Sequence, residues 1–147
     1  MLALQLENTA VKAFMGQILR EELFDQFEVR TIDIIADTRI NIDGIKESEE
    51  NTKFIKWGAL RPLIFAIIKA SSKPKAIKIV FSHTTTEDIH PNAAALFLNM
   101  VYENDMVTFT TGASQREFSL GKSLDTNWDE WVKNFFKKAE LKVNDRN

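Results

Sequence analysis

Both histidines of the chain lie in one short segment, FSHTTTEDIHP, over residues 81–91. Imidazoles and carboxylates bind zinc and act as general acids and bases, and Glu87 and Asp88 separate the two histidines. However, His83 and His90 are seven positions apart, which does not place them on one helical face as in the HExxH pattern. A metal site also needs several ligands that converge on one point. We therefore interpret the segment as a polar loop with one partly buried histidine, and we predict no metal ligand.

Nucleophilic catalysis is not indicated either. His83 has the strand parity of Ile79 and Phe81, so its ring would face the core side if the strand continues that far. Ser82 would then point to the opposite face and could not be a nucleophile with His83 as its base. The five glycines stand alone and form no phosphate-binding loop. We predict no catalytic residue and no cofactor.

A small anion pocket is the strongest ligand site that the sequence offers. Arg61 lies in the first turn of an apolar helix, Thr111 lies at the end of a strand, and Lys122 precedes the last helix. A guanidinium fork, a hydroxyl and backbone N–H groups suit a carboxylate or a phosphate. In the alternative that we favour, Arg61 binds a backbone carbonyl or an acid such as Asp129, because half-buried arginines are usually paired.

Length and composition limit the class of protein. The chain has 147 residues, enough for one domain with its own core, and no cysteine, which excludes disulfides and thiolate metal sites. Its 19 basic and 21 acidic side chains are scattered and leave a net charge of -2, so no overall field favours nucleic acid or a membrane surface. The N-terminus lacks a signal-peptide pattern, and the longest apolar stretch, residues 62–68, is too short to cross a bilayer. We expect a cytoplasmic protein without a membrane segment.

Apolar spacing predicts the elements of the N-terminal half. Leucines alternate over residues 2–6, which indicates a strand, and the period changes to that of a helix over residues 8–23. Residues 27–43 are rich in Val, Ile and Thr and predict a hairpin with its turn at 36–39. A short strand is expected at 53–57.

A helix that is apolar nearly all round is predicted within residues 57–74. Pro62 lacks an N–H group and is expected in its first turn. Such a helix is normally buried on more than one side, by another element of the chain or by a partner. We therefore expect the part of this helix around Trp57, Ile64 and Phe65 to support an interface.

The C-terminal half predicts four strands before the last helix. The first covers residues 75–82, and the next two form a hairpin around Asn104-Asp105, where a two-residue turn pairs Tyr102 with Val107. The fourth, residues 116–120, follows a turn at a glycine.

The last predicted helix has Thr126 as its N-cap and ends in lysines. Its wide apolar stripe must be covered, most cheaply by the sheet. The stripe consists of Trp128, Trp131, Val132, Phe135, Phe136 and Ala139. These elements predict a single α+β domain over residues 1–147: a mostly antiparallel sheet, two interspersed helices and a C-terminal helix packed on it. Flexible segments are predicted at 46–51 and 142–147.

Four segments carry a resemblance to a known family. They are KWGALRPLIFAIIK, KPKAIKIVF, ALFLNMVYEN and FTTGASQREFSLGKSLDTNWDEWV. Together they resemble a family of small Firmicutes proteins that is known only as a domain of unknown function. The resemblance covers most of the chain, without the histidine segment, and the chain has Asn104-Asp105 where the family pattern has Asn-Gly. It implies a bacterial protein and transfers no activity.

The order of elements is similar, more loosely, to one domain of a sliding DNA clamp, whose helices line the inner wall of a ring. That similarity implies assembly into a ring and a basic helical surface. Glu21 and Glu22 adjoin Arg20, however, and phosphate binding needs clustered positive charge. We favour an ordinary solvated surface and do not expect nucleic acid. The side chains that would have to share one surface are Lys12, Arg20, Arg61, Lys69, Lys73 and Lys75.

The sequence therefore favours a non-catalytic binding or assembly domain of unknown role, either a homo-oligomer or a domain with a protein partner. Two alternatives stay open. One is a small anionic-ligand binder or enzyme that uses Arg61 and the region of Thr111. The other is a clamp-like protein that associates with DNA.

Overall fold

The protein is a single α+β domain built on one seven-stranded sheet, as the sequence predicts. The computed structural model describes residues 1–47 and 53–146. All neighbouring strands are antiparallel, in the order β3-β2-β4-β5-β6-β1-β7. The elements are β1 (Ala3–Leu6), α1 (Val11–Arg20), β2 (Glu28–Ile35), β3 (Arg39–Asp43), α2 (Trp57–Ala70), β4 (Ala76–Ser82), β5 (Ala93–Glu103), β6 (Met106–Gln115), α3 (Ser123–Lys138) and β7 (Val143–Asp145).

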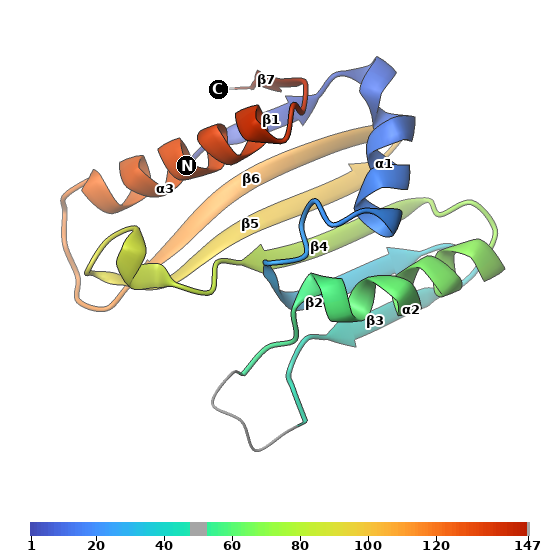
Figure 1. Ribbon diagram of the computed structural model, residues 1–147, viewed down its shortest axis with the longest axis horizontal. Helices are drawn as coiled ribbons and strands as arrows, with labels where there is room; N and C mark the ends of the chain where they lie inside the picture. The colour runs from blue at the N-terminus through green and yellow to red at the C-terminus, as the bar shows by residue number, and fades with distance from the viewer. Residues whose placement is uncertain (48–52, 147) are drawn as a thin grey trace.

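The helices divide the sheet between them. In Figure 1, α2 lies over the β2–β3 end of the sheet and α3 lies over the β6–β1 end. Along the strand order, α1 lies between them, at the right-hand side of the picture. Trp57 of α2 contacts Phe81 of β4, while Phe14 of α1 and Phe136 of α3 both contact Phe109 of β6. Phe81 and Phe109 point to the same face of the sheet, so the three helices share one core.

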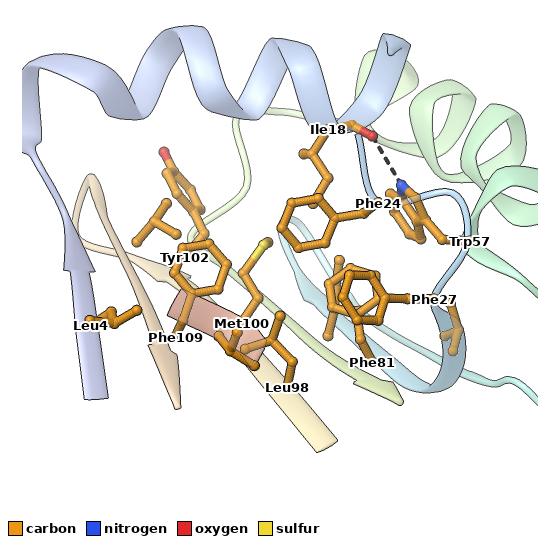
Figure 2. Close-up of a cluster of buried hydrophobic side chains, with 14 of the residues drawn as sticks. Leu4, Ile18, Phe24, Phe27, Trp57, Phe81, Leu98, Met100, Tyr102 and Phe109 are labelled. Carbon is orange, nitrogen blue, oxygen red and sulfur yellow. Dashed lines mark hydrogen bonds between the residues drawn. The ribbon is translucent and has the colours of Figure 1, made fainter. Parts of the chain in front are cut away.

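The centre of this core comes from the connection between α1 and β2. Phe24 is fully buried there, and its ring centroid lies 5.9 Å from that of Phe14, 5.2 Å from that of Phe81 and 5.3 Å from that of Phe135. Figure 2 shows Phe24 among side chains of the sheet and of α1. Close by, the indole Nε1–H of Trp57 donates a 3.0 Å hydrogen bond to the carbonyl oxygen of Ile18. This bond satisfies a buried indole and ties the start of α2 to the end of α1.

The β5–β6 hairpin follows the predicted register. Tyr102 pairs with Val107, and Asn104 and Asp105 have φ angles of 54° and 58°, as a two-residue turn between twisted strands requires. The predicted strand at 53–57 is reduced to isolated bridges, one of which joins Ile45 to Phe54. Gly44 beside it is required, because a Cβ atom there would lie 1.7 Å from the carbonyl oxygen of Val29.

The predicted fourth strand at 116–120 is wrong. Gly112 forms no turn. It lies inside β6, which continues to Gln115, and it pairs with Phe97 of β5. Residues 116–120 form a loop, in which Phe118 and Leu120 are 85% and 84% exposed. Alternation of Phe118 and Leu120 resembles a strand, but along the described chain no neighbouring strand pairs with this segment.

Two predicted helix details are also wrong. Pro62 lies in the second turn of α2 and not in the first, because the helix already begins at Trp57. Thr126 is not an N-cap, since α3 begins at Ser123 and the Thr126 N–H donates to the carbonyl oxygen of Lys122. The earlier start brings Leu124 into the core, where it is buried.

The two segments predicted to be flexible have different outcomes. Residues 143–145 of the tail form β7, which pairs with β1 at the edge of the sheet. In the predicted loop at 46–51, only Lys46 and Glu47 lie within the described residues. No helix in the described ranges is long and apolar enough to cross a membrane.

Candidate functional site

The residues of the predicted anion pocket lie apart. Arg61 forms a two-point ion pair with Asp25: its Nε and Nη2 atoms each lie 2.9 Å from a carboxylate oxygen. Both side chains are only 17% exposed. Asp25 belongs to the connection that follows α1, so the pair fastens α2 to that connection. Arg61 is thus paired with an acid, as we favoured, but the acid is Asp25 and not Asp129.

Thr111 forms hydrogen bonds with other residues. It is buried, its hydroxyl accepts a 2.8 Å hydrogen bond from the N–H of Leu2, and it donates a 2.6 Å bond to Oδ1 of Asp129. These bonds join β1, β6 and α3. Lys122 is exposed just before α3. Arg61 and Thr111 thus have different partners, and α2 and α3 cover opposite ends of the sheet (Figure 1). Among the described residues, no hydrogen bond or ion pair joins Arg61 to Thr111 or Lys122.

The predicted interface on α2 is mostly core. Trp57 and Ile64 are fully buried within the chain, and Phe65 is partly buried. Leu63 is 53% exposed. Of the large apolar side chains of this helix, Leu63 is the one that is exposed to a partner.

The two histidines have separate surroundings. His90 Nε2 lies 3.0 Å from the Ser123 hydroxyl, and its Nδ1 accepts a 3.0 Å hydrogen bond from the N–H of Asn92, so that it joins the loop to the start of α3. His83 directly follows β4, and its ring centroid lies 4.6 Å from that of Trp131 in α3. In residues 1–47 and 53–146, no three histidine or acidic side chains are grouped as metal ligands would be.

His83 lines a pocket of about 270 Å³, which we call the aromatic pocket. The connection from α1 to β2, the end of β4 and one side of α3 enclose it. Trp131 and Phe135 of α3 lie nearly parallel, at 6°, with centroids 5.6 Å apart, and Phe27 meets both rings edge-on. The lining residues are Leu23, Gln26, Phe27, His83, Thr84, Trp131 and Phe135.

The imidazole of His83 is the distinctive polar group of the aromatic pocket. Its backbone N–H donates to the carbonyl oxygen of Leu96, which fixes its position, but no hydrogen bond joins either ring nitrogen to another described residue. Burial lowers the pKa of His83 from 6.5, because desolvation disfavours the imidazolium, and the charge of Asp88 opposes this effect. The shift favours the neutral form of the ring, which has one donor and one acceptor.

Part of the aromatic pocket could be expected from the sequence, and part could not. Trp131 and Phe135 belong to the predicted stripe of α3, but the fully buried row is Leu124, Trp128, Val132 and Phe136. The predicted stripe is wider than this buried row, and its extra width indicates that α3 presents a second apolar surface beside the one that packs in the core. Leu23 was predicted in the first helix and Phe27 in the following strand, but α1 ends at Arg20 and β2 begins at Glu28, so both lie with Gln26 in the connection that forms this wall.

The fold and pocket define a small single-domain α+β protein with an aromatic cavity. Residues 17–144 match the family of unknown function DUF5721, so the chain belongs to that family. This confirms the resemblance to a family of unknown function over most of the chain. No curated protein and no solved structure gives a match, so the looser similarity to a sliding clamp has no structural counterpart.

Proposed function

We propose that this protein is a non-catalytic binding domain and that its aromatic pocket takes a neutral aromatic group that carries one hydrogen-bonding atom. One observation carries the proposal: a half-buried imidazole without a protein hydrogen bond stands in a cavity walled by three aromatic rings. Ligand sites typically combine apolar walls with a few polar groups that fix orientation.

The size and chemistry of the pocket limit its occupant. A cavity of about 150 Å³ holds benzene, so 270 Å³ accommodates one substituted ring. Trp131 and Phe135 offer ring faces and edges for aromatic contact. No lysine or arginine lines the described pocket, and neutral His83 supplies no charge, so a neutral group is favoured over an anion.

The surroundings of His83 support binding over catalysis. An imidazole that acts as a general base is usually oriented by an acid that accepts its other N–H. In the described chain, no carboxylate accepts a hydrogen bond from His83. The predicted anion-binding alternative loses its guanidinium, because Arg61 is neutralised by Asp25.

The test is a titration with phenol and toluene, followed by the indole N–H signals of the three tryptophans in an NMR spectrum. The indoles of Trp57 and Trp128 donate to carbonyl oxygens, whereas that of Trp131 lines the pocket. We expect both probes to shift the Trp131 signal and leave that of Trp57 unchanged. If neither probe moves the Trp131 signal, the proposal fails.

A matched pair of variants isolates the hydrogen bond. His83→Phe keeps a ring in the wall but removes both nitrogens, so phenol should bind more weakly while toluene does not. His90→Phe changes the histidine outside the pocket and should alter neither affinity. Equal effects of the two variants would mean that His83 does not contact the ligand.

A further inference from the structure

The loop between β6 and α3 displays two apolar side chains to solvent. Phe118 and Leu120 are 85% and 84% exposed, more than any other large apolar side chain of the described ranges. We call residues 116–122 the apolar loop. Large apolar groups presented together at a surface often mark a contact with a partner.

The apolar loop is ordered by its own hydrogen bonds. The side-chain amide of Asn92 donates to the Glu117 carbonyl (2.9 Å) and accepts from the Glu117 N–H (3.0 Å). The side-chain amide of Gln115 likewise donates to the Ser119 carbonyl (3.1 Å) and accepts from the Ser119 N–H (3.0 Å). Phe118 lies between Glu117 and Ser119, the two residues that are held in this way. A loop that is held in place before docking loses less conformational entropy when it docks.

We infer that the apolar loop is the natural occupant of the aromatic pocket, with Phe118 of one copy inserted into the pocket of a second copy. This rests on the proposed function, because it names the partner of the same site. The pocket volume of about 270 Å³ holds a phenyl ring with room for part of its neighbour. Trp131, Phe135 and Phe27 give that ring aromatic walls.

His83 complements the backbone of the docked loop. The peptide N–H groups of Phe118 and Leu120 make no hydrogen bond to another described residue. A neutral imidazole can accept a bond from such a group or donate one to a peptide carbonyl. The pocket thus offers aromatic walls for the Phe118 ring and a hydrogen-bonding imidazole for the peptide groups beside it.

Charge supports the same partner. Lys122 in the apolar loop has no ion pair among the described residues. Beside the pocket, Glu22 is exposed next to Leu23, and Asp88 acts on His83. Glu117 beside Phe118 is exposed as well, and Lys56 donates a 3.4 Å hydrogen bond to the pocket-lining Gln26. Lys122 and Glu117 of the apolar loop thus each have opposite charge beside the pocket, which favours encounter between two copies. Mutual insertion closes a two-fold dimer, the commonest homo-oligomer.

Sedimentation and light scattering from micromolar to millimolar concentration give the first test. The wild-type protein should exceed its monomer mass of 16.9 kDa as concentration rises. Phe118→Ala should weaken association about tenfold or more, as truncation of an aromatic anchor does. Leu63→Ala removes an exposed apolar side chain of α2 and should leave association unchanged. A wild type that stays monomeric, or an effect of Leu63→Ala without one of Phe118→Ala, would overturn the inference.

Crosslinking tests the identity of the contact, since the chain has no cysteine of its own. A Thr84→Cys variant carries a thiol at the pocket, and a Glu117→Cys variant carries one beside Phe118. Mixed and treated with a short bismaleimide, they should give a heterodimer in higher yield than Thr84→Cys mixed with Lys69→Cys, whose thiol lies on α2. Equal yields would count against the contact. If phenol still shifts the Trp131 signal while association and crosslinking are absent, the pocket stands as a binding site and only its occupant is wrong.

Discussion

His83 is the residue on which the proposed site depends. Its ring is half-buried against Trp131, and its nitrogens have no partner among the described residues. Burial of the ring disfavours its charged form. The neutral imidazole at the wall of an apolar cavity is therefore the group that offers a hydrogen bond to a ligand there.

The lowered pKa of His83 predicts the direction of a pH effect on stability. Below pH 6.5 the unfolded chain binds a proton at this position before the folded chain does. The free energy of unfolding should therefore fall as pH drops through 6.5, and this contribution should level off below the folded pKa. Urea unfolding between about pH 5 and 8 measures it.

The matched comparison is His83→Gln against His90→Gln. Carboxylates contribute to the pH dependence of all three proteins equally, so the difference between their curves reports the histidines. We expect the fall near pH 6.5 to be smaller in His83→Gln than in wild type. If His83→Gln keeps the full wild-type slope, the imidazole is not desolvated in the folded state.

At the scale of elements, strands and helices could be predicted because each has its own periodicity. The turn and register of the β5–β6 hairpin could be predicted, although not the end of β6, since Asn104 and Asp105 tolerate positive φ and large apolar side chains face one another. The apolar loop was misread because alternation of Phe118 and Leu120 looks like half a strand. Only the absence of a pairing partner corrects it, and pairing is a long-range property.

The candidate site was harder to predict for the same reason. Its parts come from the α1–β2 connection, the end of β4 and a flank of α3, which lie far apart in sequence. Arg61 shows the limit well. Its need for an acidic partner could be inferred from half-burial, but the choice of Asp25 depends on the path of a connection that has no periodic pattern.

The Arg61–Asp25 pair should anchor α2. Asp25→Ala leaves the guanidinium of Arg61 without its acceptor at a position where only 17% of the side chain is exposed. We expect the free energy of unfolding to fall by roughly 1.5 kcal/mol or more, the usual worth of hydrogen bonds to a charged group. Urea denaturation followed by circular dichroism measures the loss.

The surface pair between Lys73 and Asp105 is the control for this prediction. Both of its side chains are more than two thirds exposed, at 73% and 74%, so water and salt screen it. Lys73→Ala should have a much smaller effect than Asp25→Ala. Similar losses for the two variants would show that burial does not set the strength of these pairs.

At the scale of the whole molecule, one residue outside any helix or strand joins α1 and α3 to the sheet. Phe24 is fully buried and touches Phe14 of α1, Phe81 of β4 and Phe135 of α3. The core is therefore not a set of independent helix–sheet contacts. It closes around a side chain of the α1–β2 connection, and the same connection then forms one wall of the aromatic pocket.

Phe24→Ala should consequently be among the most damaging substitutions in the chain. Removal of a buried phenyl ring costs about 3–5 kcal/mol, a large share of the roughly 5–15 kcal/mol that stabilises a typical domain. Phe118→Ala makes the same chemical change at an 85% exposed position and should leave the free energy of unfolding of the monomer within about 0.5 kcal/mol of wild type. Urea unfolding at low protein concentration, where association does not contribute, compares the two. A small loss for Phe24→Ala would mean that α1 and α3 are held to the sheet separately, and the pocket would then not depend on the packing at its base.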